Sequence, residues 1–274
     1  MELYHTVLSI AGSDSSGGAG IQADMKTCSA LGTYAMSVIT SITAQNTLGV
    51  TGIMDVSPEF VRQQIDAVFA DIVPDAVKIG MLSNREIVEV VAERLAYYAP
   101  KCIVLDPVMV STSGYKLIDA AAVGMLMSQL MPMTTLVTPN RHEAELMAGQ
   151  SIDTIEDIHN AALKILELGA KAVLVKGGHF DDENMTDYLF TAAGDCVEYK
   201  SCFIDTINTH GTGCTYSSAI ASFLALGDDL KTSIAKAKKY LTGALLAGAN
   251  ISIGQGHGPV NHFYAPISLK PYKL

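Results

Sequence analysis

The stretch "TVLSIAGSDSSGGAGIQADMKTCSALG", residues 6–32, decides the fold class, because a strand, a glycine-rich turn and a helix follow one another directly. Its first seven residues are apolar almost throughout, as strands of a buried parallel sheet are. Residues 20–32 then show the apolar spacing of a helix. The same order continues along the chain, which predicts βαβ units around a mainly parallel sheet, an α/β fold.

The expected strands and helices alternate as far as residue 178. We expect strands at 6–12, 34–45, 75–80, 102–108, 135–140 and 172–178, and helices at 20–32, 57–72, 84–98 and 154–169. After them the pattern predicts a hairpin around "AAGD" (192–195), helices at 214–227 and 229–250, and an irregular tail rich in Gly and Pro. Because no linker interrupts the 274 residues, we expect one domain, residues 1–274.

The composition restricts the class of protein. Hydrophobic residues make up 49% of the chain and charged residues 17%, which is enough apolar surface for a large core. The net charge of −10 argues against general affinity for nucleic acid. No apolar run reaches the roughly 20 residues of a membrane helix, and the start lacks the features of a signal peptide, so we expect a cytoplasmic protein. Five cysteines without a CxxC pair are expected to be free thiols.

The glycine-rich turn was tested against two known phosphate loops. Counting GxxxxGK[ST] from Gly12 places Gly18 and Ala19 where Lys and Ser or Thr are required, so the turn is not a Walker A loop. The dinucleotide pattern GxGxx[GA] is met at Gly18, Gly20 and Ala23. It also requires an acidic residue about 20 positions on, and that strand ends in "QN" instead. The turn therefore predicts only that a ligand approaches the backbone closely.

Two carboxylates near this turn have two interpretations. Asp14 and Asp24 are placed to accept a hydrogen bond from a bound ligand. Alternatively, the glycines only shape a tight strand-to-helix connection, and Asp24 lies on a solvated helix face.

Polar residues follow several strands, at the edge where ligands bind in open α/β sheets. Asp106 ends one strand, Asn140 and Glu143 follow the next, and Lys176 follows a third. Asn140 and Glu143 could hold Mg²⁺ through water, and Lys176 could place its charge on a phosphate. In the alternative interpretation Asp-Pro only ends a strand and Asn140 caps a helix whose first turn favours Glu143.

The segment "HGTGCT", residues 210–215, points most directly to a ligand. Successive backbone N–H groups at a helix start form an anion site, and phosphate suits it. Cys214 in the first turn would feel the same field, which predicts a thiol pKa below the usual value of about 8.5. Two alternatives remain: Cys214 is a small buried apolar residue, or it binds zinc with His210 although no second ligand pair is present.

Taken in order, seven motifs resemble the hydroxymethylpyrimidine and phosphomethylpyrimidine kinase family of the ribokinase-like superfamily. They are "AGSDSSGGAGIQAD", "ITAQNT", "KIGML", "LDPVM", "TPNxxEA", "VKGGH" and "NTHGTGCT", and the likeness extends to the "GHGPVNHF" tail. The resemblance implies a three-layer α/β/α sandwich with a mainly parallel central sheet. It implies an enzyme that transfers phosphoryl groups from ATP to hydroxymethylpyrimidine, first giving the monophosphate and then the diphosphate used in thiamine synthesis.

The resemblance also implies a site. Catalysis would involve Cys214, in the place where many relatives carry an aspartate base, together with the turn Gly211, Thr212 and Gly213. The pyrimidine would contact Gly12, Asp14, Ala19, Asp24, Thr43, Gln45, Met81 and Val108, with Gln45 bonding the ring. ATP would contact Lys176, Asp106, Asn140 and Thr206, while Glu143 and Asp106 would hold Mg²⁺ through water. A homodimer is expected, since related kinases are often dimers.

The chain departs from the family's motifs at two places, and three other functions are alternatives to the kinase. Some members carry Glu where this chain has Gln45, and others a lysine in the flap that reads Ser111, Thr112 and Ser113. Pyridoxal kinase is the nearest rival, because its substrate is also a nitrogen aromatic with a CH₂OH group. A silent pyrimidine-binding module would be free to lose Asp106, Lys176 or the glycine turn, and all three are present. A dinucleotide oxidoreductase is the most distant rival.

Overall fold

The computed structural model describes residues 2–110, 117–178 and 184–273 and confirms the expected three-layer α/β/α arrangement. A nine-stranded sheet forms the middle layer, in the order β10-β9-β8-β7-β6-β5-β2-β3-β4. The pairs from β3 through β2, β5, β6 and β7 to β8 are parallel, whereas β4, β9 and β10 are attached in antiparallel fashion. The carboxyl ends of six parallel strands therefore meet at one edge.

Apart from β4, the strands of this sheet occur at or near their expected positions. They are β2 (Thr6–Asp14), β3 (Tyr34–Asn46), β4 (Gly49–Asp55), β5 (Ala76–Ile79), β6 (Ile103–Leu105), β7 (Leu136–Val137), β8 (Ala172–Gly178), β9 (Asn184–Thr191) and β10 (Cys196–Cys202). The expected hairpin turn at 192–195 joins β9 to β10. β4 was not expected, because its two glycines and largely exposed side chains hide the alternation of a strand.

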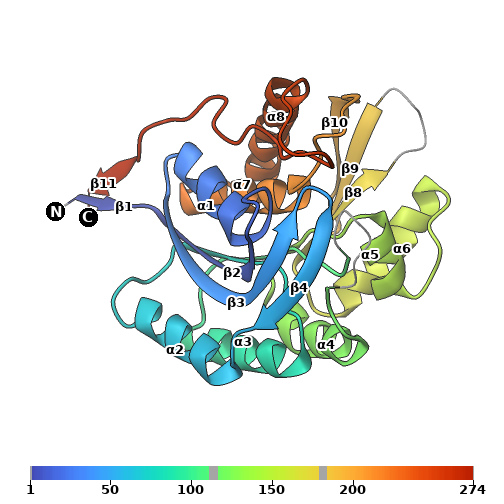
Figure 1. Ribbon diagram of the computed structural model, residues 1–274. Helices are drawn as coiled ribbons and strands as arrows, with labels where there is room; N and C mark the ends of the chain where they lie inside the picture. Colours follow the sequence, from blue (N-terminus) through green and yellow to red (C-terminus); the bar gives the residue numbers. More distant parts are fainter. Residues whose placement is uncertain (1, 111–116, 179–183, 274) are drawn as a thin grey trace.

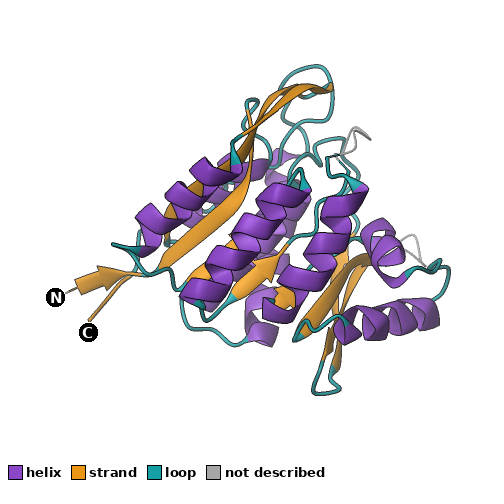
Figure 2. Ribbon diagram, turned by 90° about the horizontal axis from the view of Figure 1, so that it is seen from below, coloured by secondary structure: helices purple, strands orange, loops and turns teal. Residues whose placement is uncertain are grey.

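Helices cover both faces of the sheet (Figures 1 and 2). One apolar core lies under α2 (Pro58–Phe69), α3 (Arg85–Tyr98), α4 (Ala120–Met125), the turns η1 (Leu126–Leu130) and η2 (Met131–Met133), α5 (Arg141–Ala148) and α6 (Ile155–Glu167). A second core lies under α1 (Gly20–Ala30), α7 (Thr212–Ala225) and α8 (Leu230–Gly248) on the other face. α4 and the turns after it were not expected, since their small and sulfur-containing side chains give no clear apolar stripe.

Local chemistry explains where the helices begin. Ser57 accepts the N–H of Phe60 at the start of α2, and Pro58 occupies its first position. α5 begins with a capping box in which Asn140 and Glu143 bond each other's backbone. The capping role weighed for Asn140 is therefore confirmed, and it directs the first turn of α5 to the carboxyl edge of the sheet.

Two segments extend outside the three layers, one beside the irregular tail and one at the chain ends. The ribbon β3–β4 extends beyond the helices in Figure 2, and its turn at Thr47 binds the backbone of Gln255 and Gly256 in the irregular tail. At the opposite end of the parallel strands, β1 (Glu2–Tyr4) pairs with β11 (Pro271–Lys273). This brings the two termini together (Figure 1).

Candidate active site

One cavity of about 720 Å³ opens at the carboxyl edge of the sheet, which is the size of a site for a small molecule. Nearly all residues singled out in the sequence line it, although they come from many segments of the chain. Among its lining residues are Gly12, Asp14, Ala19, Thr43, Gln45, Met81, Asp106, Val108, Asn140, Glu143, Lys176, Gly211, Thr212, Gly213 and Cys214. The expected flap at 111–113 lies outside the described residues.

The anion site expected at "HGTGCT" is the first turn of α7. Gly211 is the N-cap, with φ of 78°, and α7 starts at Thr212. A Cβ at Gly211 would overlap the carbonyl of Gly18, so the turn lies directly against the glycine-rich turn after β2. Only glycine satisfies both conditions. Thr212, Gly213 and Cys214 of this first turn line the cavity, where the N-terminal end of the helix dipole favours an anion.

An ion pair lies beside this turn. The Lys176 ammonium is 2.9 Å from Asp106 Oδ1, and Ser217 of α7 donates to Oδ2 of the same carboxylate at 3.2 Å. A Cβ on Gly213 would be 3.5 Å from both Asp106 Oδ2 and Lys176 Nζ. Although burial opposes ionisation, Lys176 and Lys78 lower the pKa of Asp106. Positive side chains and free amides thus converge on one place, as bound phosphate requires.

Glu143 is the second carboxylate in this region, and it is almost fully buried. Burial, opposed by Lys176 and supported by Asp106, raises its pKa to about 7. Its Oε2 accepts the N–H of Asn140, so the side chain also holds the start of α5. The residues that the structure describes contain no group of three or more His, Cys, Asp or Glu side chains suited to hold a metal directly. Two carboxylates without further ligands fit a hydrated Mg²⁺, which keeps several waters.

Asp14 joins the two glycine turns. Its Oδ2 lies 2.8 Å from His210 Nε2 and accepts the N–H groups of Gly18 and Ala19, while Oδ1 accepts Ser16. Burial favours the neutral acid, but the hydrogen bonds from His210, Ser16 and Ala19 lower the pKa of Asp14 to about 2. Because these partners occupy the carboxylate, Asp14 holds the shape of the cavity wall and has little capacity left for a substrate.

The end of the cavity under β2, β3 and β5 is small and partly polar. Thr43 donates to Gln45 Oε1 at 3.0 Å, and Gln45 Nε2 lies 3.5 Å from His210 Nε2. Met81 lies against Gly12, where a Cβ would be 3.1 Å from its sulfur. Such a pocket suits a flat ring with hydrogen-bonding groups on its edge.

The opposite end of the cavity is formed by β8 to β10 and α8 and includes apolar side chains. Phe203, Ile204 and Leu241 line it. Lys238 lies 2.6 Å from Asp187, and the other oxygen of Asp187 accepts the N–H of Gly177 at 3.0 Å. This end therefore offers apolar surface for a base and a fixed ion pair beside it.

The expectation of a lowered thiol pKa at Cys214 is wrong. Burial raises the pKa of Cys214 to about 11; Lys78 lowers it, Asp24 and Asp106 raise it further, and the Gly20 backbone lowers it slightly. The dipole of α7 does not compensate for the loss of water. The thiol is therefore protonated near neutral pH.

Two other expectations are corrected by position. Asp24 is neither a cavity residue nor on a solvated face: it is fully buried and forms an ion pair with Lys78 at 2.9 Å. Thr206 also lies outside the cavity lining, and its hydroxyl donates to the carbonyl of Ala249. Both expectations fail for the same reason, because the side chains of Asp24 and Thr206 are already bonded to other residues of this chain.

Sequence reasoning missed four polar residues near the cavity. Lys78 interrupts the apolar strand "DAVKIG", and a lysine inside a buried strand was a usable signal. His210 was considered only as a zinc ligand, although it is next to the glycine turn. Asp187 and Lys238 gave no local signal, because β9 and α8 bring them together from 51 positions apart.

These features match one family along most of the chain. The family model described as phosphomethylpyrimidine kinase matches residues 14–261. The chain belongs to the phosphomethylpyrimidine kinase family. It is therefore a phosphotransferase of ribokinase-like fold, and membership of a kinase family implies ATP as a substrate and a divalent metal ion.

Individual relatives support this membership. The hydroxymethylpyrimidine/phosphomethylpyrimidine kinase of Rhizobium meliloti is 52% identical over 94% of this chain and 96% of its own. Two solved structures are similar: the phosphomethylpyrimidine kinase of Clostridium difficile 630 (48% identity, TM-score 0.78, 88% of this chain and 99% of that one) and the Bacillus subtilis pyridoxal kinase in an ADP complex (35%, 0.87, 95% and 98%). The chain spans about half the length of the bifunctional thiamine biosynthesis relatives that it also matches.

In this phosphomethylpyrimidine kinase family member, no helix among the described residues has the length and hydropathy needed to cross a membrane. All five cysteines are free, as expected.

Proposed function

We propose that this protein transfers a phosphoryl group from ATP to the hydroxymethyl group of 4-amino-5-hydroxymethyl-2-methylpyrimidine, and then a second one to the resulting monophosphate. One observation carries the proposal. The turn at Gly211–Cys214, with the Asp106–Lys176 pair, lies in one cavity with a ring pocket under β2, β3 and β5 and an apolar region under β8 to β10.

We infer which ligand occupies each end of the cavity, and the positions of the lining residues along the strand order support this inference. The pyrimidine lies between Gly12, Met81 and Gln45, with its hydroxymethyl group toward Cys214. The base of ATP lies in the region near Phe203, so its phosphates reach Lys176 and the first turn of α7. The acceptor hydroxyl and the terminal phosphate then meet at Cys214. Such a transfer depends chiefly on alignment and on neutralising charge.

Asp106 and Glu143 would hold Mg²⁺ through water, and the ion would neutralise charge on the phosphates. Both carboxylates line the cavity beside the first turn of α7, which supports this placement. Because the Cys214 thiol is protonated in the free protein, we propose that it orients the acceptor hydroxyl and does not remove its proton. Thiolates, not thiols, accept protons.

Pyridoxal is a second acceptor that a specific observation favours. The Cys214 thiol lines the ring pocket, where it could add reversibly to an aldehyde. The Bacillus subtilis pyridoxal kinase with the same fold is consistent with room for a pyridine ring.

The deciding experiment is a kinase assay with purified protein, ATP and Mg²⁺. It compares hydroxymethylpyrimidine, its monophosphate and pyridoxal at equal concentrations, with kcat/KM measured for each. We expect both pyrimidines to be phosphorylated with higher kcat/KM than pyridoxal. Turnover of pyridoxal alone would overturn the proposed substrate.

A further inference from the structure

The buried ion pair beneath the cavity is not used by the chemistry described so far. Lys78 and Asp24 have no exposed side-chain surface, and Lys78 Nζ lies 2.9 Å from each carboxylate oxygen of Asp24. Taking two charges out of water is costly, and their mutual attraction often only compensates for that cost. A pair at this position therefore calls for a role other than stability.

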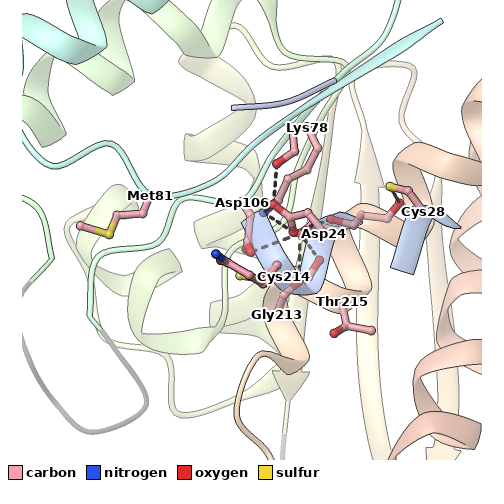
Figure 3. A network of polar contacts seen from close by, with 12 residues as sticks. Asp24, Cys28, Lys78, Met81, Asp106, Gly213, Cys214 and Thr215 are labelled. Carbon is pink, nitrogen blue, oxygen red and sulfur yellow. Dashed lines mark hydrogen bonds and ion pairs between the residues drawn. The ribbon is translucent and has the colours of Figure 1, made fainter. Parts of the chain in front are cut away.

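The remaining contacts of Asp24 connect separate parts of the site. Ser218 of α7 donates to Oδ1 at 2.6 Å, and Ser9 of β2 donates to Oδ2 at 2.5 Å. Figure 3 shows Asp24 on α1 at the centre of this network, between Lys78 and Cys214. One carboxylate therefore joins α1, α7, β2 and β5 by four hydrogen bonds.

These contacts lie one helical turn below both glycine turns. Asp24 is four positions after Gly20, where α1 begins, and Ser218 is four positions after Cys214. Residues four apart lie on the same face of a helix. The bond from Ser218 to Asp24 thus holds together the two helix starts whose turns touch at Gly18 and Gly211.

We propose that Lys78, Asp24 and Ser218 form a positioning unit for phosphoryl transfer, which fixes the α1 and α7 helix starts relative to each other. This inference rests on the proposed function. The unit touches neither substrate, so it affects the alignment of bound reactants and not their binding. Both phosphorylation steps use the same alignment and depend on the unit equally.

Two substitutions on the same helix test the proposal. Ser218→Ala removes the bond between α7 and Asp24. Ser222→Ala is the matched control, because Ser222 is equally buried one turn later and donates to the Ser218 carbonyl at 2.9 Å. The readouts are the melting temperature, kcat and KM for ATP and for both pyrimidines, with activity measured well below each transition.

For Ser218→Ala we expect kcat to fall roughly tenfold in both steps while each KM stays within about twofold, as for a small misalignment of bound reactants. Ser222→Ala should keep kcat within about twofold of wild type. An unchanged kcat in Ser218→Ala, an equal fall in both variants, or a fall in one step only would each overturn the proposal. A wild-type protein inactive on every acceptor would instead contradict the proposed function.

A second comparison separates alignment from stability. Lys78→Met alone leaves a buried carboxylate unpaired and should lower the melting temperature. Lys78→Met with Asp24→Leu removes both charges and should recover much of it, as replacing a buried ion pair often does. We expect kcat to stay low in the double variant. Recovery of both melting temperature and kcat would show that the pair is only structural.

Discussion

Two effects change the pKa of the Cys214 thiol in opposite directions, and their magnitudes decide which one prevails. Its place in the first turn of α7 favours the thiolate, but the dipole contributes typically only 0.3–1 kcal/mol, up to about 2 kcal/mol in favourable partly buried geometries. Burial in the cavity wall is larger here and raises the pKa of the thiol to about 11. A thiol at the acceptor position can donate a hydrogen bond and fill space without acting as a base.

Substitution of Cys214 should therefore separate orientation from base catalysis. Cys214→Ser keeps a hydroxyl donor of similar size, so we expect it to retain kcat within about tenfold of wild type. A lost base would cost about 10²–10⁴. The measurement is kcat for both phosphorylation steps between pH 6 and 9. A fall of more than about 10² in Cys214→Ser, with unchanged KM, would restore the base role.

Glu143 should make Mg²⁺ binding depend on pH. Its pKa is raised from 4.5 to about 7, so the carboxyl is mostly protonated below that pH and ionised above it. A metal ligand must be ionised. We expect the Mg²⁺ concentration needed for half-maximal activity to fall as pH rises through about 7. In Glu143→Gln it should be higher and should not change in this range; a parallel pH response in the variant would contradict the assignment.

Asp14 should stabilise the fold in a defined range of pH. Its folded pKa of about 2 lies below the ordinary 3.8, so its contribution is present above pH 4 and is lost as pH falls toward 2. The shift corresponds to about 2 kcal/mol. Asp14→Asn should lower the free energy of unfolding by about this amount at pH 7, measured with urea, and by less near pH 3.

The control for Asp14→Asn is Asp71→Asn, at an exposed carboxylate. Its free energy of unfolding should change by less than about 0.5 kcal/mol at every pH. A deficit in Asp14→Asn that is the same at pH 7 and pH 3 would point to packing and not to charge.

At the scale of elements, the start of α7 combines two glycines with different roles. Gly211 has a left-handed backbone and no room for a Cβ beside Gly18. Gly213 does not have a positive φ, and a Cβ there would meet Asp106 and Lys176 at ordinary contact distance, in the space assigned to phosphate. One glycine is required by the fold, and we propose that the other is required by the ligand.

Alanine at each position should give opposite results. Gly211→Ala should lower the free energy of unfolding by roughly 3 kcal/mol, from strain and overpacking together. Gly213→Ala should change stability by less than about 1 kcal/mol. Its kcat/KM should nevertheless fall by roughly 10² or more, because it blocks the amides. Thermal or urea unfolding and the kinase assay decide this; a fully active Gly213→Ala would exclude phosphate from this turn.

The sequence predicted the elements that carry a strong periodic pattern and missed those formed by pairing alone. β2, β3 and β8 follow their apolar runs, whereas β4 is held by the ladder to β3 and has little apolar character of its own. The same distinction applies to the site. Asp106 and Lys176 end strands and were predicted, but Asp187 and Lys238 meet only through tertiary contacts. Burial also reversed the prediction for Cys214, because a motif does not tell how much water its residues retain.

At the scale of the whole molecule, the cavity draws on both helical layers and on the sheet. Lys238 of α8, Glu143 of α5 and Gln45 of β3 all line it. A ligand that spans the cavity therefore connects elements that would separate on unfolding.

We expect ATP with Mg²⁺ to stabilise the fold as a whole. At about 100 times its Kd, a ligand that binds only the folded state contributes about 2.7 kcal/mol, or roughly 5–10 °C in melting temperature for a chain of this size. Differential scanning fluorimetry measures the shift. Lys176→Met should reduce it, since the ammonium beside the first turn of α7 is lost. An equal shift in wild type and variant would place the nucleotide elsewhere.

The homodimer remains a prediction, which light scattering of the purified protein decides. A mass near 29.0 kDa would correspond to a single chain and would contradict it.

The pairing of β1 with β11 has a consequence for protein engineering. Glu2 and Lys273 are register partners, at the end of the parallel strands opposite the cavity. A linker of a few glycines would connect these two residues, so the chain is well suited to circular permutation. The new termini could be placed in an exposed turn such as 192–195. A second catalytic domain fused to either terminus would be attached at the same place on the molecule. Its linker would not obstruct the entry of substrate into the cavity.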